Sequence, residues 1–128
     1  MLPYVEAKMN NKRLGNEFEK EMCKKLNDAG YWVHFISPDV TGAQPFDIIA
    51  VKDNVPFAFD CKTAVKRWFP ISRLEINQIM AFDKWIARGN GTPMIAVKYK
   101  DEIKIVSYWE LKTKGKVDLE DDHVICGW

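Results

Sequence analysis

The chain has 128 residues, of which 47% are hydrophobic and 29% charged, so we expect one globular domain over residues 1–128 rather than a disordered chain. Three widely spaced cysteines argue against a disulfide framework or a structural zinc site, and no apolar run is long enough to span a membrane. Residues 1–13 lack the apolar stretch of a signal peptide, and we expect a protein of the reducing cytoplasm.

The charges are unevenly distributed although the net charge is only +1. Residues 62–116 carry 12 Lys+Arg and 5 Asp+Glu, whereas residues 117–128 carry four acidic residues and no Lys or Arg. A concentration of positive charge favours a polyanionic partner such as nucleic acid. A lysine-rich solvated surface would give the same pattern, so charge alone leaves both interpretations open.

The first third of the chain predicts a helix, a strand and a loop. Four apolar residues repeat every fourth position within residues 11–29, which is typical of an amphipathic helix that ends at Gly30. These residues are Leu14, Phe18, Met22 and Leu26. Residues 31–36 are aromatic and β-branched and predict a strand, and residues 37–45 form a loop rich in Pro, Asp and Gly.

The rest of the chain predicts two hairpins separated by a helix. Strands are expected over residues 46–51, 57–62, 94–99 and 103–108, with the second pair turning at Lys100-Asp101. A helix is expected over residues 72–88, opened by a capping box with Ser72 as N-cap and Glu75 at N3. A helical turn over residues 109–112 and a strand over residues 123–126 follow. The core, residues 12–108, therefore has the order α-β-β-β-α-β-β, an α/β fold with a central mixed sheet flanked by helices, and residues 109–128 form a C-terminal extension.

The first hairpin places two acidic residues opposite each other. If the turn is centred on Asp53-Asn54, Asp47 pairs with Asp60, and the Cβ atoms of directly opposed residues lie about 4.5–5.5 Å apart. Both faces of the hairpin are otherwise apolar. Ile49, Val51 and Ala58 share the face of the aspartates, and the other face carries Phe46, Ile48, Ala50, Phe57, Phe59 and Cys61. Opposed buried carboxylates destabilise a sheet unless something neutralises them.

A divalent cation would compensate for this repulsion, because carboxylate oxygens are the ligands that Mg²⁺ selects. Lys62 follows Asp60 by two residues and shares its face, where an ammonium group could stabilise a developing anion. The alternative is that both aspartates are solvated at strand ends, with Lys62 as a salt-bridge partner.

Two helical residues are placed to reach this site. Glu19 lies at the margin of the apolar stripe of the first helix, and Gln78 lies inside the stripe of the second helix. Their alternatives are a solvated carboxylate for Glu19 and a core amide bonded to backbone for Gln78. The second helix also has another apolar face, formed by Ile76, Ile79, Met80 and Ile86, which hints at a dimer.

A helix-borne Glu19, the spacing Asp47-x12-Asp60-x-Lys62 and a helix with Gln78 resemble the PD-(D/E)xK nuclease superfamily, which implies a restriction-endonuclease-like fold. Within it, residues 14–19 are similar to the helix opening of Hjc-type Holliday junction resolvases, which puts the metal-binding glutamate at Glu19. Residues 59–63 and 69–71, followed by the Gln78 helix, are similar to RecU-type resolvases. The loops at 37–45 and 52–56 are too short for the RecU stalk, as in a short phage or prophage resolvase.

The resemblance implies hydrolysis of DNA phosphodiester bonds, leaving 5′-phosphate and 3′-hydroxyl ends. Asp47, Asp60 and Glu19, with the Cys61 carbonyl, would hold one or two Mg²⁺ ions, for which Mn²⁺ would substitute. Lys62 would position the nucleophile or neutralise charge, and Gln78 would orient the water or Lys62.

Binding of DNA is expected from residues that flank the site. They are Arg13, Thr41, Gln44, Lys66, Arg67, Trp68 and Arg73, with core packing as the alternative for Trp68 and Phe69.

The leading hypothesis is a Mg²⁺-dependent, structure-selective endonuclease that resolves four-way junctions as a homodimer, which supplies two active sites. Alternatives are a restriction- or repair-type nuclease of the same fold acting on duplex or flap DNA, and a non-catalytic DNA-binding module. A small α/β domain that binds a protein partner through the second face of the Gln78 helix is a further alternative.

Overall fold

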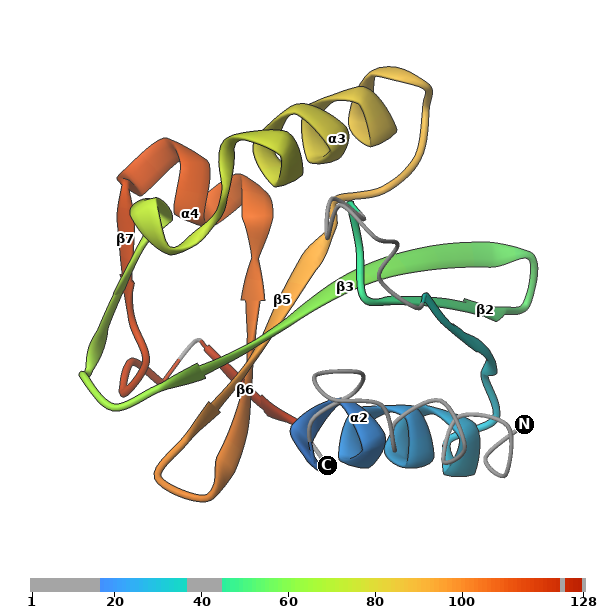
Figure 1. Cartoon of the computed structure of the whole chain (residues 1–128), viewed down its shortest axis with the longest axis horizontal. Coiled ribbons are helices and arrows are strands. Elements are labelled where there is room, and N and C mark those ends of the chain that lie inside the picture. Colours follow the sequence, from blue (N-terminus) through green and yellow to red (C-terminus); the bar gives the residue numbers. More distant parts are fainter. Residues whose placement is uncertain (1–16, 37–44, 123, 128) are drawn as a thin grey trace.

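The computed structural model describes residues 17–36, 45–122 and 124–127, and it consists of one main sheet between helices, as Figure 1 shows. The strands of the main sheet lie in the order β1-β2-β3-β5-β6-β8. They are β1 (Trp32–Phe35), β2 (Ile48–Lys52), β3 (Val55–Ala64), β5 (Met94–Tyr99), β6 (Glu102–Ser107) and β8 (Ile125–Gly127). Only β3 and β5 run parallel and the other described neighbours are antiparallel, which confirms the predicted mixed sheet.

Helices cover both faces of this sheet. Helix α2 (Glu17–Asp28) lies on one face, and α3 (Ile76–Ala87) and α4 (Tyr108–Lys114) lie on the other (Figure 1). The predicted stripe of the first helix is confirmed for Phe18, Met22 and Leu26, which are buried against the sheet. Leu14 lies outside the described residues.

The turn between β2 and β3 has the geometry that its sequence predicts. Asp53 and Asn54 have φ angles of 53° and 68°, the left-handed conformation that two-residue hairpins need at both central positions. The ladder runs from Ile48↔Phe59 to Lys52↔Val55, which confirms the predicted register. The β5–β6 hairpin has the same left-handed conformation at both central turn residues, with φ angles of 50° and 63° at Lys100 and Asp101.

Phe46 lies on the opposite side of the sheet from the one predicted. We expected it to share a face with Ile48 and Ala50, but its ring stacks on Phe82 of α3, with centroids 5.2 Å apart and planes at 2°. Strand β2 begins only at Ile48, so the alternation of faces does not extend back to Phe46.

The start of the second helix was also predicted wrongly. Helix α3 begins at Ile76 with Glu75 as its N-cap, whereas Ser72 lies in a short 3-10 turn, Ile71–Arg73. Leu74 is extended (φ −93°, ψ 140°) and buried, so the chain leaves the turn to place this side chain in the core before the helix begins.

The sequence did not predict a second, two-stranded sheet made by β4 (Trp68–Pro70) and β7 (Lys116–Asp118). Helix α4 is longer than the predicted helical turn and ends at Gly115, whose φ of 81° gives a left-handed cap. None of the described helices is long and apolar enough to cross a membrane.

We predict that Phe82→Ala lowers the free energy of unfolding by about 3–5 kcal/mol, measured by urea denaturation. The Phe82 ring is fully buried and contacts both Phe46 and Tyr108, so truncation leaves a cavity in the α3 layer. Met80→Ala on the exposed side of the same helix is the matched control and should change stability by less than about 0.5 kcal/mol. Equal effects of the two substitutions would contradict this packing.

Candidate active site

Asp47 and Asp60 are both buried, with exposed fractions of 8% and 1%. The backbone of Asp47 is fixed from two sides, because its N–H donates to Phe59 O (3.0 Å) and its carbonyl accepts from Ile36 N (2.8 Å). Its Oδ2 accepts a hydrogen bond of 2.8 Å from the Cys61 backbone N–H. The β2–β3 ladder ends at Ile48↔Phe59, and the Asp47 N–H bonds Phe59 O rather than a backbone group of Asp60. The two carboxyl groups lie close enough to interact, whereas their direct cross-strand pairing stays a prediction.

Lys62 and Gln78 complete a hydrogen-bonded group around Asp60. Lys62 Nζ lies 3.1 Å from Asp60 Oδ2 and donates to Gln78 Oε1 at 3.3 Å. Gln78 Nε2 donates to Asp60 Oδ1 at 2.7 Å, and Gln78 Oε1 also accepts from Glu75 N at 3.1 Å. The Gln78 amide is therefore oriented by three partners, and it links the first turn of α3 to Asp60 on strand β3.

The environment of Asp60 opposes its negative charge. Burial is the main cause, followed by the neighbouring charge of Asp47, and together they raise the pKa of Asp60 to about 8 although Lys62 acts in the opposite direction. Asp60 Oδ2 is buried, and no hydrogen bond of normal geometry reaches it among the described residues. Its contact among these residues is the ion pair with Lys62 Nζ, which lacks hydrogen-bond geometry. A carboxylate pair with one oxygen free of a well-formed hydrogen bond fits a divalent cation, which would neutralise the pair.

Glu19 and Cys61 are less directly arranged. Glu19 lies partly buried in the first turn of α2, and its charge contributes to raising the pKa values of the Cys23 and Cys61 thiols, for which burial is the main cause. The described part of the chain contains no group of three His, Cys, Asp or Glu side chains arranged to hold a metal ion. Metal binding by Glu19 and by the Cys61 carbonyl therefore stays a prediction.

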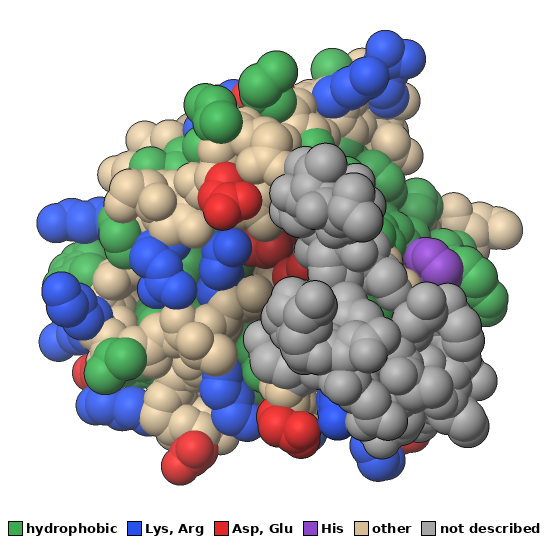
Figure 2. Space-filling model, in the orientation of Figure 1, with side chains coloured by type: hydrophobic (Ala, Val, Ile, Leu, Met, Phe, Trp, Pro, Cys, Tyr) green, Lys and Arg blue, Asp and Glu red, His purple; other side chains and the backbone are tan. Residues whose placement is uncertain are grey.

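Acidic and basic side chains meet near the middle of the face drawn in Figure 2, where Asp/Glu side chains lie in a hollow beside Lys/Arg side chains.

The predicted DNA-binding residues of the described chain differ in their exposure. Arg73 is exposed, donates to Thr63 O at 2.8 Å and lies over the Phe69 ring at 5.2 Å. Lys66 is exposed in the loop after β3, and Trp68 is 49% exposed, whereas Phe69 is fully buried. Core packing is thus confirmed for Phe69, and the Trp68 ring stays partly accessible.

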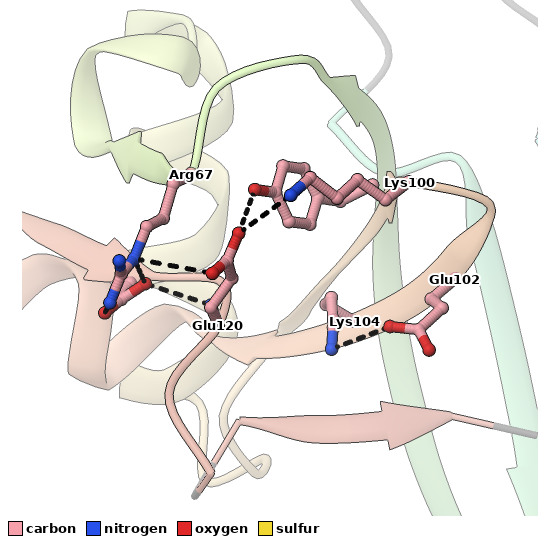
Figure 3. Close-up of polar contacts among 7 residues, drawn as sticks. Arg67, Lys100, Glu102, Lys104 and Glu120 are labelled. Carbon is pink, nitrogen blue, oxygen red and sulfur yellow. Dashed lines mark hydrogen bonds and ion pairs between the residues drawn. The ribbon is translucent and has the colours of Figure 1, made fainter.

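Arg67 differs from the other predicted DNA-binding residues because carboxylates already hold it. Its guanidinium makes two hydrogen bonds to Asp118, of 2.7 and 2.8 Å, and lies 3.9 Å from Glu120 (Figure 3). Glu120 also accepts from Tyr99 and Lys100, so the acidic C-terminal residues bind the β5–β6 hairpin and the loop before β4. These contacts give Asp118 and Glu120 a structural role that the sequence did not indicate.

Lys116 is a candidate contact that the sequence did not single out, and its Nζ lies 4.9 Å from the centre of the Trp68 ring. The β4–β7 pairing brings these two residues together, and no local pattern signals it. Arg13, Thr41 and Gln44 lie outside the described residues.

A mixed sheet with Asp47, Asp60 and Lys62 close together, and a helix-borne Gln78 beside them, is the arrangement expected of the PD-(D/E)xK class of nucleases. The family model for the archaeal Holliday junction resolvases (Hjc) matches residues 10–125. The chain therefore belongs to the Hjc family. This membership confirms a metal-dependent, structure-selective endodeoxyribonuclease that acts on branched DNA, and of the two resolvase types suggested by the sequence it favours Hjc.

Two relatives agree with this assignment. The chain is 28% identical over 112 residues to the crossover junction endodeoxyribonuclease Hjc of Methanocaldococcus jannaschii, with 88% of this chain and 79% of that protein covered. The structure of Archaeoglobus fulgidus Hjc, a Holliday junction resolvase, has the same fold, with a TM-score of 0.62 and 17% identity. That likeness covers 80% of this chain and 85% of the other.

The raised pKa of Asp60 predicts how the metal-free protein depends on pH. A carboxyl group whose pKa is raised in the folded state binds its proton more tightly when folded, so stability is lost as pH rises from about 4 to about 8. Each pH unit of elevation corresponds to about 1.4 kcal/mol, and we expect wild type to lose at least about 2 kcal/mol relative to Asp60→Asn between pH 5 and pH 8 in EDTA.

The measurement is urea unfolding at several pH values, with Asp101→Asn in the exposed β5–β6 turn as the control that keeps the wild-type pH dependence. Parallel pH profiles for wild type and Asp60→Asn would show that Asp60 is not forced toward its protonated form.

Proposed function

We propose that this protein resolves four-way DNA junctions as a homodimer, using Mg²⁺ held by Asp47 and Asp60. The observation that carries the proposal is the buried Asp47–Asp60 pair, with Lys62 and Gln78 against it. A binding module has no need of opposed carboxylates in its core, where they oppose folding. The pair therefore supports catalysis over binding alone.

Asp47 and Asp60 would hold the cation, with Glu19 and the Cys61 carbonyl as further ligands. When bound, Mg²⁺ or Mn²⁺ would polarise the scissile phosphate and make water a better nucleophile at neutral pH.

Lys62 would act on the reacting phosphate, because its ammonium group is partly exposed beside Asp60 and can neutralise charge that develops in the transition state. Gln78 is a positioning residue in this proposal. Its side chain holds both Asp60 and Lys62, and its own orientation is fixed by the Glu75 N–H.

Binding of DNA outside the centre would use Lys66, Trp68 and Arg73, which flank the Lys62 end of β3. Arg67 would contribute less to phosphate contacts, because Asp118 already satisfies its guanidinium. Contacts by Arg13, Thr41 and Gln44 and a cytoplasmic location remain predictions from the sequence. A homodimer would provide the two sites that symmetric cleavage of a junction requires.

The test is cleavage of a labelled synthetic four-way junction and a matched linear duplex, in Mg²⁺ and in EDTA. We expect paired symmetric cuts in the junction only, absent in EDTA and with Asp60→Asn. Equal cutting of the junction and the duplex would support metal-dependent cleavage of DNA but refute selective resolution of junctions. A wild type that cuts neither substrate in Mg²⁺ or Mn²⁺ would refute the catalytic proposal.

We predict that Lys62→Ala lowers the cleavage rate about 100- to 1000-fold, the range observed when one charge-stabilising group is removed from an active site. Junction affinity measured in Ca²⁺ should stay within about threefold, because the other phosphate contacts remain. Lys84→Ala, on the exposed surface of α3, controls for the loss of one positive charge. A parallel loss of affinity and rate would instead make Lys62 a binding residue.

A further inference from the structure

Strand β1 exposes two aromatic rings at the edge of the main sheet. Trp32 and His34 occupy alternate positions and are exposed, Trp32 by 63%, whereas the intervening Val33 and the following Phe35 are 5% exposed. The two exposed rings stack on each other, with centroids 6.0 Å apart and planes at 10°. The stacked rings present a flat aromatic surface to solvent.

This surface lies on the same face of the sheet as the candidate active site. Directly paired residues of adjacent strands point to the same face, so the pairing His34↔Ile49 and Ile49↔Ala58 forms one row across β1, β2 and β3. Asp60 is two residues beyond Ala58 on that face, where it contacts Gln78 of α3. From strand spacings of about 4.8 Å and a rise of about 3.3 Å per residue, His34 lies about 12 Å from Asp60.

A distance of about 12 Å is comparable with the width of the major groove of DNA. By the same spacings, Trp32, which lies in the row Trp32↔Val51 and Val51↔Pro56, is about 16 Å from Asp60. DNA whose phosphate reaches Asp60 and Lys62 can therefore extend as far as the Trp32–His34 rings. Trp and His rings are among the side chains on which unstacked nucleobases pack, and such contacts tolerate any base because every base has a flat π-face. A four-way junction offers such bases at its branch point, where stacking between arms is interrupted.

We propose that Trp32 and His34 form a stacking platform for a nucleobase exposed at the branch point of the DNA substrate. A second copy of the chain is the other conceivable occupant, but a protein docked on these rings would take up space that DNA needs to reach Asp60. The rings share the sheet face of Asp60, at about 12 Å for His34 and about 16 Å for Trp32, and this placement favours DNA. The proposal rests on the nuclease function and adds to it a basis for preferring branched over linear substrates.

The test compares the affinities of Trp32→Ala, Trp32→Phe and His34→Ala for a fluorescent four-way junction and for a matched linear duplex, in Ca²⁺. Trp32→Ala should bind the junction about tenfold more weakly, which is within the range found for the loss of one base–aromatic stack. Affinity for the duplex should change less than about twofold, and Trp32→Phe should retain most of the junction affinity. Trp109→Ala, which removes a 55% exposed tryptophan from α4, should bind both DNAs as wild type does.

Three results would overturn the platform. These are unchanged junction affinity in Trp32→Ala, an equal loss for junction and duplex, or a halved molecular mass of Trp32→Ala in sedimentation velocity, which would make the surface a subunit interface. Wild-type cleavage of the same junction in Mg²⁺ is measured in parallel. A wild type that does not cleave refutes the nuclease function itself, whereas cleavage with unaltered Trp32→Ala binding refutes only the platform.

Discussion

The repulsion between two carboxylates buried opposite each other is the constraint on which the structure depends. Asp47 and Asp60 come together because they directly adjoin the last pair of the β2–β3 ladder, Ile48↔Phe59, whose register is fixed by the Asp53-Asn54 turn. A slip of one residue would move one strand's side chains to the other face of the sheet and separate the pair. The fold therefore maintains an unfavourable contact that only a proton or a cation relieves, and this cost is typical of a functional site.

Helix α3 is the element that turns this pair into an organised site. Leu74 enters the core in an extended conformation, and the helix begins two residues later, so Gln78 falls in its first turn. At this position the Gln78 side chain bonds the backbone of the N-cap residue and still reaches Asp60 and Lys62. The start of α3 therefore also sets the orientation of the Gln78 amide, which positions Lys62.

The sequence predicted those parts of the site that depend on local patterns. Turn chemistry and apolar alternation were sufficient to give the register of the β2–β3 ladder, which brings Asp47 near Asp60, and the contact of Lys62 with Asp60. Gln78 was found because an amide interrupts an apolar stripe. Features that depend on contacts distant in sequence were missed, since the Arg67–Asp118 pair and the β4–β7 sheet join segments about 50 residues apart. Phe46 was misplaced because alternation cannot show where a strand begins.

Metal binding by the aspartate pair can be tested by a crystal structure of the protein grown with Mn²⁺, in which anomalous scattering locates the ion. We predict a manganese ion bonded to carboxylate oxygens of both Asp47 and Asp60, at about 2.1 Å, with Lys62 Nζ displaced from its contact with Asp60 Oδ2. An ion bound elsewhere, or an unbound pair with Lys62 still against Asp60, would show that the aspartates are neutralised by the lysine and a proton, which would contradict a metal-dependent site at this position.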